Sequence, residues 1–135
     1  MTKSILWFAE IRKEDVGIVG GKGANLGELT SFNVPVPPGF VVSAAAYFEF
    51  LKFGSLEAKI THELAGLKVE STQKLEKASQ NIKTAILSSK VPPLLISEIK
   101  ESYHRLSGTH DALVAVRSSA TAEDLAEASF AGQQE

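Results

Sequence analysis

The chain has 135 residues, 44% of them hydrophobic, which is enough for one domain with a core and too little for two. Its formal net charge is -2 and it has no basic run, which argues against nucleic-acid binding. It has no cysteine, so disulfides and thiolate metal sites are excluded. No apolar stretch approaches the length of a signal peptide core or a membrane span, so we expect a cytoplasmic protein without a membrane partner.

The N-terminal part predicts a strand, a charged loop and a glycine-rich turn that opens a helix. Residues 5–8 are apolar and aromatic, which is typical of a short strand. The glycines of Gly20-Gly21-Lys22-Gly23 permit positive φ angles and close backbone approach. A helix is expected to begin near Gly23, because apolar residues follow at helical spacing: Leu26, Leu29 and Phe32.

This turn could bind an anion. A helix start presents free N–H groups and a positive dipole end, and Lys22 adds a cation there. The spacing of a Walker A loop is absent, because Gly23 stands where a Ser or Thr would be. Taken alone, the pattern favours a tight turn with a solvated Lys22 over a phosphate site.

The middle of the chain predicts structure without chemistry. The prolines of residues 34–40 form a stiff connector into a strand over 40–42, and Ser43 is a plausible N-cap for a helix over 44–53. The aromatic residues of that helix, Tyr47 and Phe48 among them, are interpreted as core packing rather than an adenine-stacking site. Two amphipathic helices are expected within 55–90.

A further helix should begin at Pro92-Pro93 and end at Gly108. None of the three histidines has a partner at metal-ligand spacing, so we interpret them as surface or structural residues: His62, His104 and His110.

An apolar, Val-rich run over 112–116 predicts a buried strand, and Arg117 follows it directly. A guanidinium on such a rigid base offers a planar fork of donors that matches phosphate or carboxylate oxygens. Arg117 could equally pair with Glu123 or Asp124 and close the strand end.

The hydroxyls after Arg117 also leave two interpretations open. Ser118, Ser119 and Thr121 could bind phosphate oxygens, or they could cap the loop. The spacing Thr121-x-x-Asp124 fits a capping box, which favours the second interpretation slightly.

Two runs carry a resemblance to a known family. The run from Arg117 to Leu125, continued by Ala128-Ser129-Phe130-Ala131-Gly132-Gln133-Gln134-Glu135, closely resembles the nucleotide-binding domain shared by phosphoenolpyruvate synthase, pyruvate phosphate dikinase and rifampicin phosphotransferase. The run Gly20 to Leu29 is similar to the N-terminal motif of the same family, in the same order along the chain. Ser119 stands where the dikinase branch usually has Gly, so the resemblance leans to the synthase or rifampicin branch. Ala126 departs from the Pro that relatives commonly carry.

The resemblance implies an α/β fold: the helix-rich N-terminal part of an ATP-grasp-like nucleotide-binding domain with a small sheet. Residues 1–135 would be the N-terminal portion of the ATP-binding domain, truncated at its C-terminal end, because the motif is still running at Glu135. It implies that Lys22 and Arg117 contact ATP phosphates, and that Gly132 lets the backbone approach the nucleotide. We therefore expect Lys22 and Arg117 to converge on one cleft.

The reaction implied is that of a pyruvate, water dikinase, which converts ATP, pyruvate and water to phosphoenolpyruvate, AMP and phosphate. It uses Mg²⁺, a phosphohistidine carrier on another domain and a separate pyruvate domain. The magnesium carboxylates and the carrier histidine would lie beyond Glu135, so the chain alone should be inactive and should self-associate. Two alternatives remain: a rifampicin phosphotransferase, and a non-catalytic nucleotide-binding or interaction module.

Overall fold

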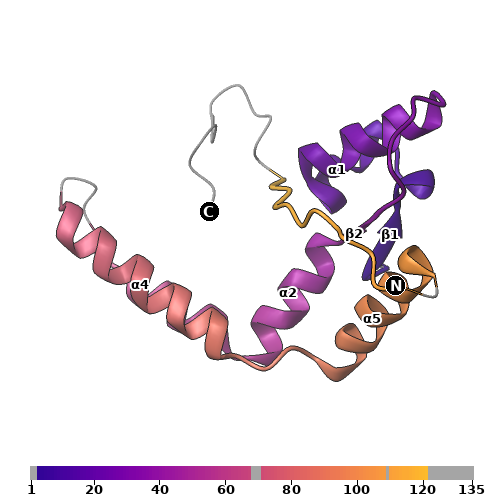
Figure 1. Ribbon diagram of the computed structural model, residues 1–135. Coiled ribbons are helices and arrows are strands. Elements are labelled where there is room, and N and C mark those ends of the chain that lie inside the picture. Colours follow the sequence, from indigo (N-terminus) through magenta and orange to yellow (C-terminus); the bar gives the residue numbers. More distant parts are fainter. Residues whose placement is uncertain (1–2, 68–70, 109, 122–135) are drawn as a thin grey trace. The chain divides into compact units, whose positions relative to one another are not determined.

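The computed structural model describes residues 3–67, 71–108 and 110–121 (Figure 1). These residues form five α-helices and one two-stranded sheet, so the expected helix-rich α/β class with a small sheet is confirmed. In chain order the elements are β1 (Ile5–Trp7), 3₁₀ helices Phe8–Glu10 and Lys13–Asp15, α1 (Val16–Ser31), β2 (Phe40–Val42), α2 (Ala44–Phe53), α3 (Leu56–Leu64), α4 (Thr72–Ser88) and α5 (Pro93–Ser107).

The chain divides into two compact units, one of Met1–Tyr47 with Leu94–Glu135 and one of Phe48–Pro93. Composition predicts a single core, but the described residues hold two small hydrophobic clusters, one in each unit. The first cluster is Ile11, Val19 and Ala24, and the second is Leu51, Leu56 and Ala85. Both clusters are small because the buried helix faces carry mostly glycine and alanine.

The sheet of the first unit pairs β1 with β2 in antiparallel register, with Ile5 opposite Val42 and Trp7 opposite Phe40. The rings of Trp7 and Phe40 lie 5.5 Å apart at 56°, a cross-strand aromatic contact that stabilises the pair. The strands predicted over 5–8 and 40–42 are therefore confirmed, except that Phe8 belongs to the following 3₁₀ helix.

Helix α1 begins at Val16 and is kinked at Gly20, whose φ is 73°. Its second part begins after the kink, at Gly21, close to the helix start that the sequence predicted near Gly23. The buried face differs from the prediction: it consists of small residues, whereas Phe32, on the predicted apolar stripe, is 70% exposed. Glycine permits this packing: a Cβ at Gly27 would lie 2.5 Å from the Cβ of Ile11.

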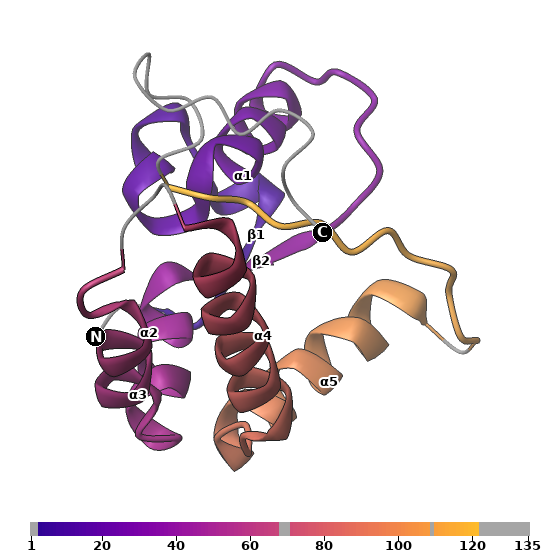
Figure 2. The ribbon, with the colours of Figure 1, turned by 90° about the vertical axis from the view of Figure 1, so that its left-hand side faces the viewer.

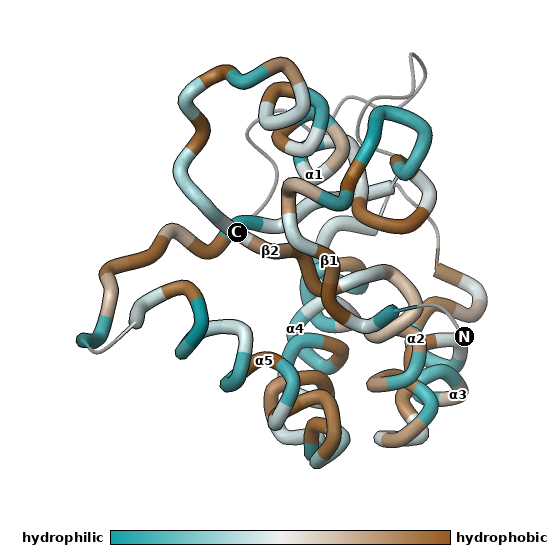
Figure 3. The backbone as a smooth tube through the Cα atoms, turned by 90° about the vertical axis from the view of Figure 1, so that its right-hand side faces the viewer, coloured by the Kyte–Doolittle hydropathy of each residue, from teal (hydrophilic) through white to brown (hydrophobic). Residues whose placement is uncertain are grey.

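The predicted buried strand over 112–116 is wrong. Residues 110–121 form neither helix nor strand in the described chain, and the side chain of Val116 is 92% exposed. The segment is apolar along much of its length, as its brown colour after α5 shows (Figure 3). A strand needs a neighbour to pair with its backbone, and apolarity alone does not provide one. The Tyr103 hydroxyl donates to the Ala112 carbonyl over 2.9 Å and ties the start of the segment to α5.

The helices from α2 onward follow their local signals. The buried Ser43 hydroxyl accepts a hydrogen bond from the Ala46 N–H at 3.3 Å, which confirms it as the N-cap of α2. The interpretation of Tyr47 as core packing is wrong, because it is 48% exposed, and Phe48 is also exposed. The buried residues of this helix are Ala46, 1% exposed, and Leu51, 7% exposed.

Helices α3, α4 and α5 agree with the sequence prediction. Helix α5 begins at Pro93, and Gly108 follows its last residue with φ 68° and an N–H donated to the His104 carbonyl over 2.9 Å. All three histidines are exposed. None of the helices in the described residues combines the length and the apolarity that a bilayer crossing requires.

Candidate functional site

The two sequence motifs meet in the first unit through Ser119. Its hydroxyl donates a hydrogen bond to the Val19 carbonyl at 2.7 Å and accepts one from the Gly23 N–H at 3.0 Å. Next to it, the Gly21 N–H donates to the Ala120 carbonyl at 3.1 Å. The segment after α5, drawn in yellow-orange, passes β2 and reaches α1 (Figure 2). Residues about 100 positions apart in sequence are thus joined by three hydrogen bonds.

The kink at Gly20 creates a second helix start inside α1. The residues that follow resume helical geometry, so the N–H groups of Gly21 and Gly23 lie in a first turn and lack partners within the helix. Ala120 and Ser119 supply those partners. The Ser119 side chain therefore acts as an N-cap for the second helix start, although it is distant in sequence.

This arrangement corrects one expectation about the site. The helix start was expected to offer free N–H groups to an anion, but the N–H groups of Gly21 and Gly23 are already hydrogen-bonded within the protein. The Ser119 hydroxyl bonds to α1 rather than to its own loop, a role that neither interpretation of the sequence gave.

Only glycine fits at position 20. Its φ of 73° is one that side chains rarely adopt, and a Cβ there would overlap with the carbonyl oxygen and the hydroxyl of Ser119. A Cβ at Gly23 would lie 3.1 Å from the Cβ of Val19 and 3.3 Å from Cγ2 of Val41. The predicted close approach at these glycines is thus to other parts of the same chain: to Ser119 at Gly20 and to the side chains of Val19 and Val41 at Gly23.

The bonded junction brings the backbone segments of Lys22 and Arg117 together. Lys22 lies between the two bonded glycines and is half-buried, and Arg117 lies two residues before Ser119 and is exposed. That their side chains share one cleft stays a prediction. Gly132 and the carboxylates expected to pair with Arg117 or to complete the capping box lie outside the described residues.

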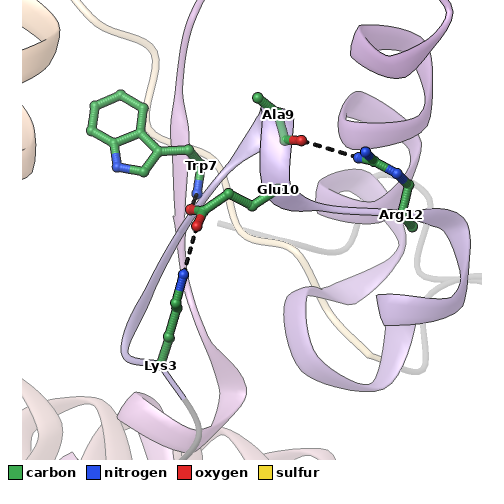
Figure 4. Close-up of polar contacts among 5 residues, drawn as sticks. All are labelled: Lys3, Trp7, Ala9, Glu10 and Arg12. Carbon is green, nitrogen blue, oxygen red and sulfur yellow. Dashed lines mark hydrogen bonds and ion pairs between the residues drawn. The ribbon is translucent and has the colours of Figure 1, made fainter.

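A hollow of about 530 Å³ lies elsewhere in the first unit, between β1 and α5, and neither Lys22 nor Arg117 lines it. The Arg105 guanidinium lies 4.6 Å from the centre of the Trp7 ring, at cation–π distance. The Glu10 carboxylate accepts hydrogen bonds from the Lys3 ammonium at 2.6 Å and from the Trp7 N–H at 3.0 Å (Figure 4). These contacts, that of Lys3 foremost, lower the pKa of Glu10 below its ordinary value.

The polar contacts near this hollow hold the turn after β1. Arg12 donates from its guanidinium to the Ala9 carbonyl at 3.1 Å (Figure 4). Sequence reasoning missed this cluster, because its residues follow no helical or strand spacing. Among residues 3–67, 71–108 and 110–121, no group of three or more metal-ligating side chains comes together.

Comparison with known proteins decides the family. Residues 16–135 match the model of the pyruvate phosphate dikinase AMP/ATP-binding domain. The chain belongs to this family. The matched range contains both motifs, with Lys22, Arg117 and Gly132, so every residue predicted to bind nucleotide falls inside the AMP/ATP-binding domain.

Curated relatives agree with this assignment. A probable phosphoenolpyruvate synthase of Methanothermobacter thermautotrophicus is 51% identical over 100% of this chain and 20% of its own length. A probable phosphoenolpyruvate synthase of Methanocaldococcus jannaschii is 49% identical over 98% of this chain and 11% of its own. The phosphoenolpyruvate synthase of Aquifex aeolicus is 45% identical over 97% of this chain and 16% of its own. The chain thus spans a fifth or less of the length of these relatives.

Proposed function

We propose that this chain is the N-terminal portion of the ATP-binding domain of a phosphoenolpyruvate synthase, with the ATP-grasp-like architecture of such domains. The whole enzyme would convert ATP, pyruvate and water to phosphoenolpyruvate, AMP and phosphate, through a phosphohistidine on another domain and pyruvate held in a third. The observation that carries the proposal is the junction at Ser119, which joins the segments of Lys22 and Arg117 within the matched AMP/ATP-binding region.

The proposed chemistry suits the residues. Phosphoryl transfer depends on positioning and charge stabilisation more than on covalent chemistry from side chains. Arg117 would clamp phosphate oxygens with two parallel donors, and Lys22 would neutralise outer oxygens as a point charge. Because the Gly21 and Gly23 N–H groups are hydrogen-bonded to residues 119–120, these side chains would carry the phosphate contacts. Gly132 would let the backbone approach the nucleotide closely.

Magnesium is the expected companion of ATP in this reaction. Within the part of the chain that the structure describes, no three metal-ligating side chains come together, and the carboxylate ligands of Mg²⁺ are proposed to lie further along the polypeptide.

The complete polypeptide encoded by the source gene provides the test. Incubated with ATP, pyruvate and Mg²⁺, it should form phosphoenolpyruvate, AMP and phosphate, measured by ³¹P NMR. Lys22→Met and Arg117→Ala should each lower kcat/KM for ATP about a hundredfold or more, because each removes a preorganised charge from the phosphates. Lys77→Met is the matched control, since Lys77 is an exposed lysine of α4.

Other outcomes point to the alternatives. In a parallel incubation with rifampicin in place of pyruvate, phosphorylated rifampicin would indicate the antibiotic phosphotransferase if pyruvate gave no phosphoenolpyruvate. ATP binding without AMP formation in either incubation would indicate a non-catalytic module. The names of the relatives favour the synthase.

A further inference from the structure

At the junction of the two motifs, the Ser119 hydroxyl acts as both a hydrogen-bond donor and a hydrogen-bond acceptor. It donates to the Val19 carbonyl, just before the kink, and accepts from the Gly23 N–H, just after it. A single side chain thus bonds to both arms of the kinked helix. Ser119 lies two residues after Arg117, and its two partners bracket the turn that carries Lys22.

We propose that Ser119 is a positioning residue for the nucleotide site. Its hydroxyl fixes the Arg117 segment on the Lys22 turn and so sets where the two cations stand relative to the ATP phosphates. This role rests on the proposed function, because it requires that Lys22 and Arg117 bind those phosphates. Ser119 itself does not need to touch the nucleotide.

The geometry argues for a specific role of the hydroxyl. Removing it leaves both the Gly23 N–H and the Val19 carbonyl without their partner, and Val19 and Gly23 are buried. The bond from the Gly21 N–H to the Ala120 carbonyl does not involve the hydroxyl and would remain. Gly20 contributes to the same junction, because a side chain there would overlap with Ser119.

The first arm of the test measures the junction itself, in the complete polypeptide, by amide hydrogen exchange. Ser119→Ala should speed exchange at the Gly23 N–H about tenfold, and Ser119→Thr, which keeps the hydroxyl, should restore protection. Ser31→Ala is the matched control: its hydroxyl donates to the Glu28 carbonyl at 2.7 Å in the same helix, away from the junction.

A second pair of variants tests the junction without removing the hydroxyl. Gly20→Ala places a methyl group against Ser119 and should also speed exchange at Gly23. Gly17→Ala is its control, because a Cβ at Gly17 meets nothing within 4 Å.

The second arm measures kinetics in the complete polypeptide. Ser119→Ala should raise KM for ATP about tenfold and leave KM for pyruvate unchanged, and Ser119→Thr should return KM for ATP toward its original value. A residue that only stabilised the fold would lower kcat, through loss of folded enzyme, and leave both KM values unchanged.

Together, the exchange and kinetic measurements show whether the positioning role of Ser119 is wrong or whether the proposed function is wrong. Unchanged Gly23 exchange in Ser119→Ala, or an unchanged KM for ATP, overturns the positioning role. If Lys22→Met and Arg117→Ala leave ATP kinetics intact, both the proposed phosphate site and the role of Ser119 in it fall. Faster Gly23 exchange in Ser119→Ala would then identify the hydroxyl as a structural cap alone.

Discussion

Gly27 of α1 is closely packed and Gly17 of the same helix is not, so alanine at the two positions should change the free energy of unfolding in opposite directions. Alanine at Gly27 would place its Cβ 2.5 Å from the Ile11 Cβ and 2.8 Å from the Ile11 carbonyl oxygen, which is backbone and cannot turn away. We expect Gly27→Ala to lower the free energy of unfolding by about 1–3 kcal/mol, the usual cost of overpacking. Urea denaturation measures this change.

The control is Gly17→Ala, in the same helix. Gly17 is exposed and has open space around it, so alanine should stabilise the helix by about 0.5–1 kcal/mol. Equal effects of the two substitutions would contradict the close packing of α1 on Ile11.

The Lys3–Glu10 ion pair predicts a pH dependence. Lys3→Met should raise the pKa of Glu10 toward its ordinary value, and the Trp7 N–H should keep part of the depression. Because the folded-state pKa is lowered, Glu10 stabilises the protein above its unfolded-state pKa, and this contribution is lost as pH falls through the folded-state pKa. NMR titration of the Glu10 carboxyl carbon measures the shift.

The stability difference should be small, about 0–1 kcal/mol, because both side chains are substantially exposed. It should vanish at a pH below the folded-state pKa of Glu10, where the wild type and Lys3→Met converge. A difference that persists there would indicate a contribution from Lys3 other than its pairing with Glu10.

The resemblance to the family, rather than residue types alone, assigned Lys22 and Arg117 to the candidate site. The backbone segments of both residues lie at the junction. The role of Ser119 stayed open, because a hydroxyl suits both a phosphate and a backbone cap. Its bond to the Gly23 N–H, 96 positions earlier, is a tertiary contact that no local pattern indicates.

At the scale of elements, the sequence correctly predicted the helix starts and ends that depend on neighbouring residues. The cap at Ser43, the proline start of α5 and the glycine end at Gly108 depend on neighbouring residues alone, and all three are confirmed. The failures involve distant partners. The small-residue face of α1 is buried because Ile11 packs against it, and the run over 112–116 has no strand beside it in the described chain.

Helix α2 provides a prediction at this scale. Leu51 belongs to the second hydrophobic cluster and is 7% exposed, so Leu51→Ala should lower the free energy of unfolding by about 2–5 kcal/mol. Phe53, in the same helix, is 54% exposed, and Phe53→Ala should cost about 1 kcal/mol or less. Thermal denaturation of both variants measures the contrast. A larger loss at Phe53 than at Leu51 would mean that the helix buries a different face.

At the scale of the whole molecule, we predict that this chain by itself makes no phosphoenolpyruvate and binds ATP weakly or not at all. Arg117 is exposed, so a phosphate bound there remains largely in water. A charge pair at 4 Å contributes about 1 kcal/mol in water and several times more in an enclosed site. Calorimetry of the chain with Mg-ATP, beside the complete polypeptide, measures the difference. Micromolar binding by the chain would show that the site is complete within these residues.

The junction at Ser119 also sets an order of events during synthesis. Val19 leaves the ribosome 100 residues before Ser119 does. At about 5–20 residues per second, that interval is roughly 5–20 s. Throughout it, the N–H groups of Gly21 and Gly23 have only water to bond. Closing so long a loop costs entropy that no local contact repays in advance. The kinked helix therefore acquires this cap only after Ser119 has been synthesised, and a nascent chain that ends before Ser119 has no hydroxyl to supply it.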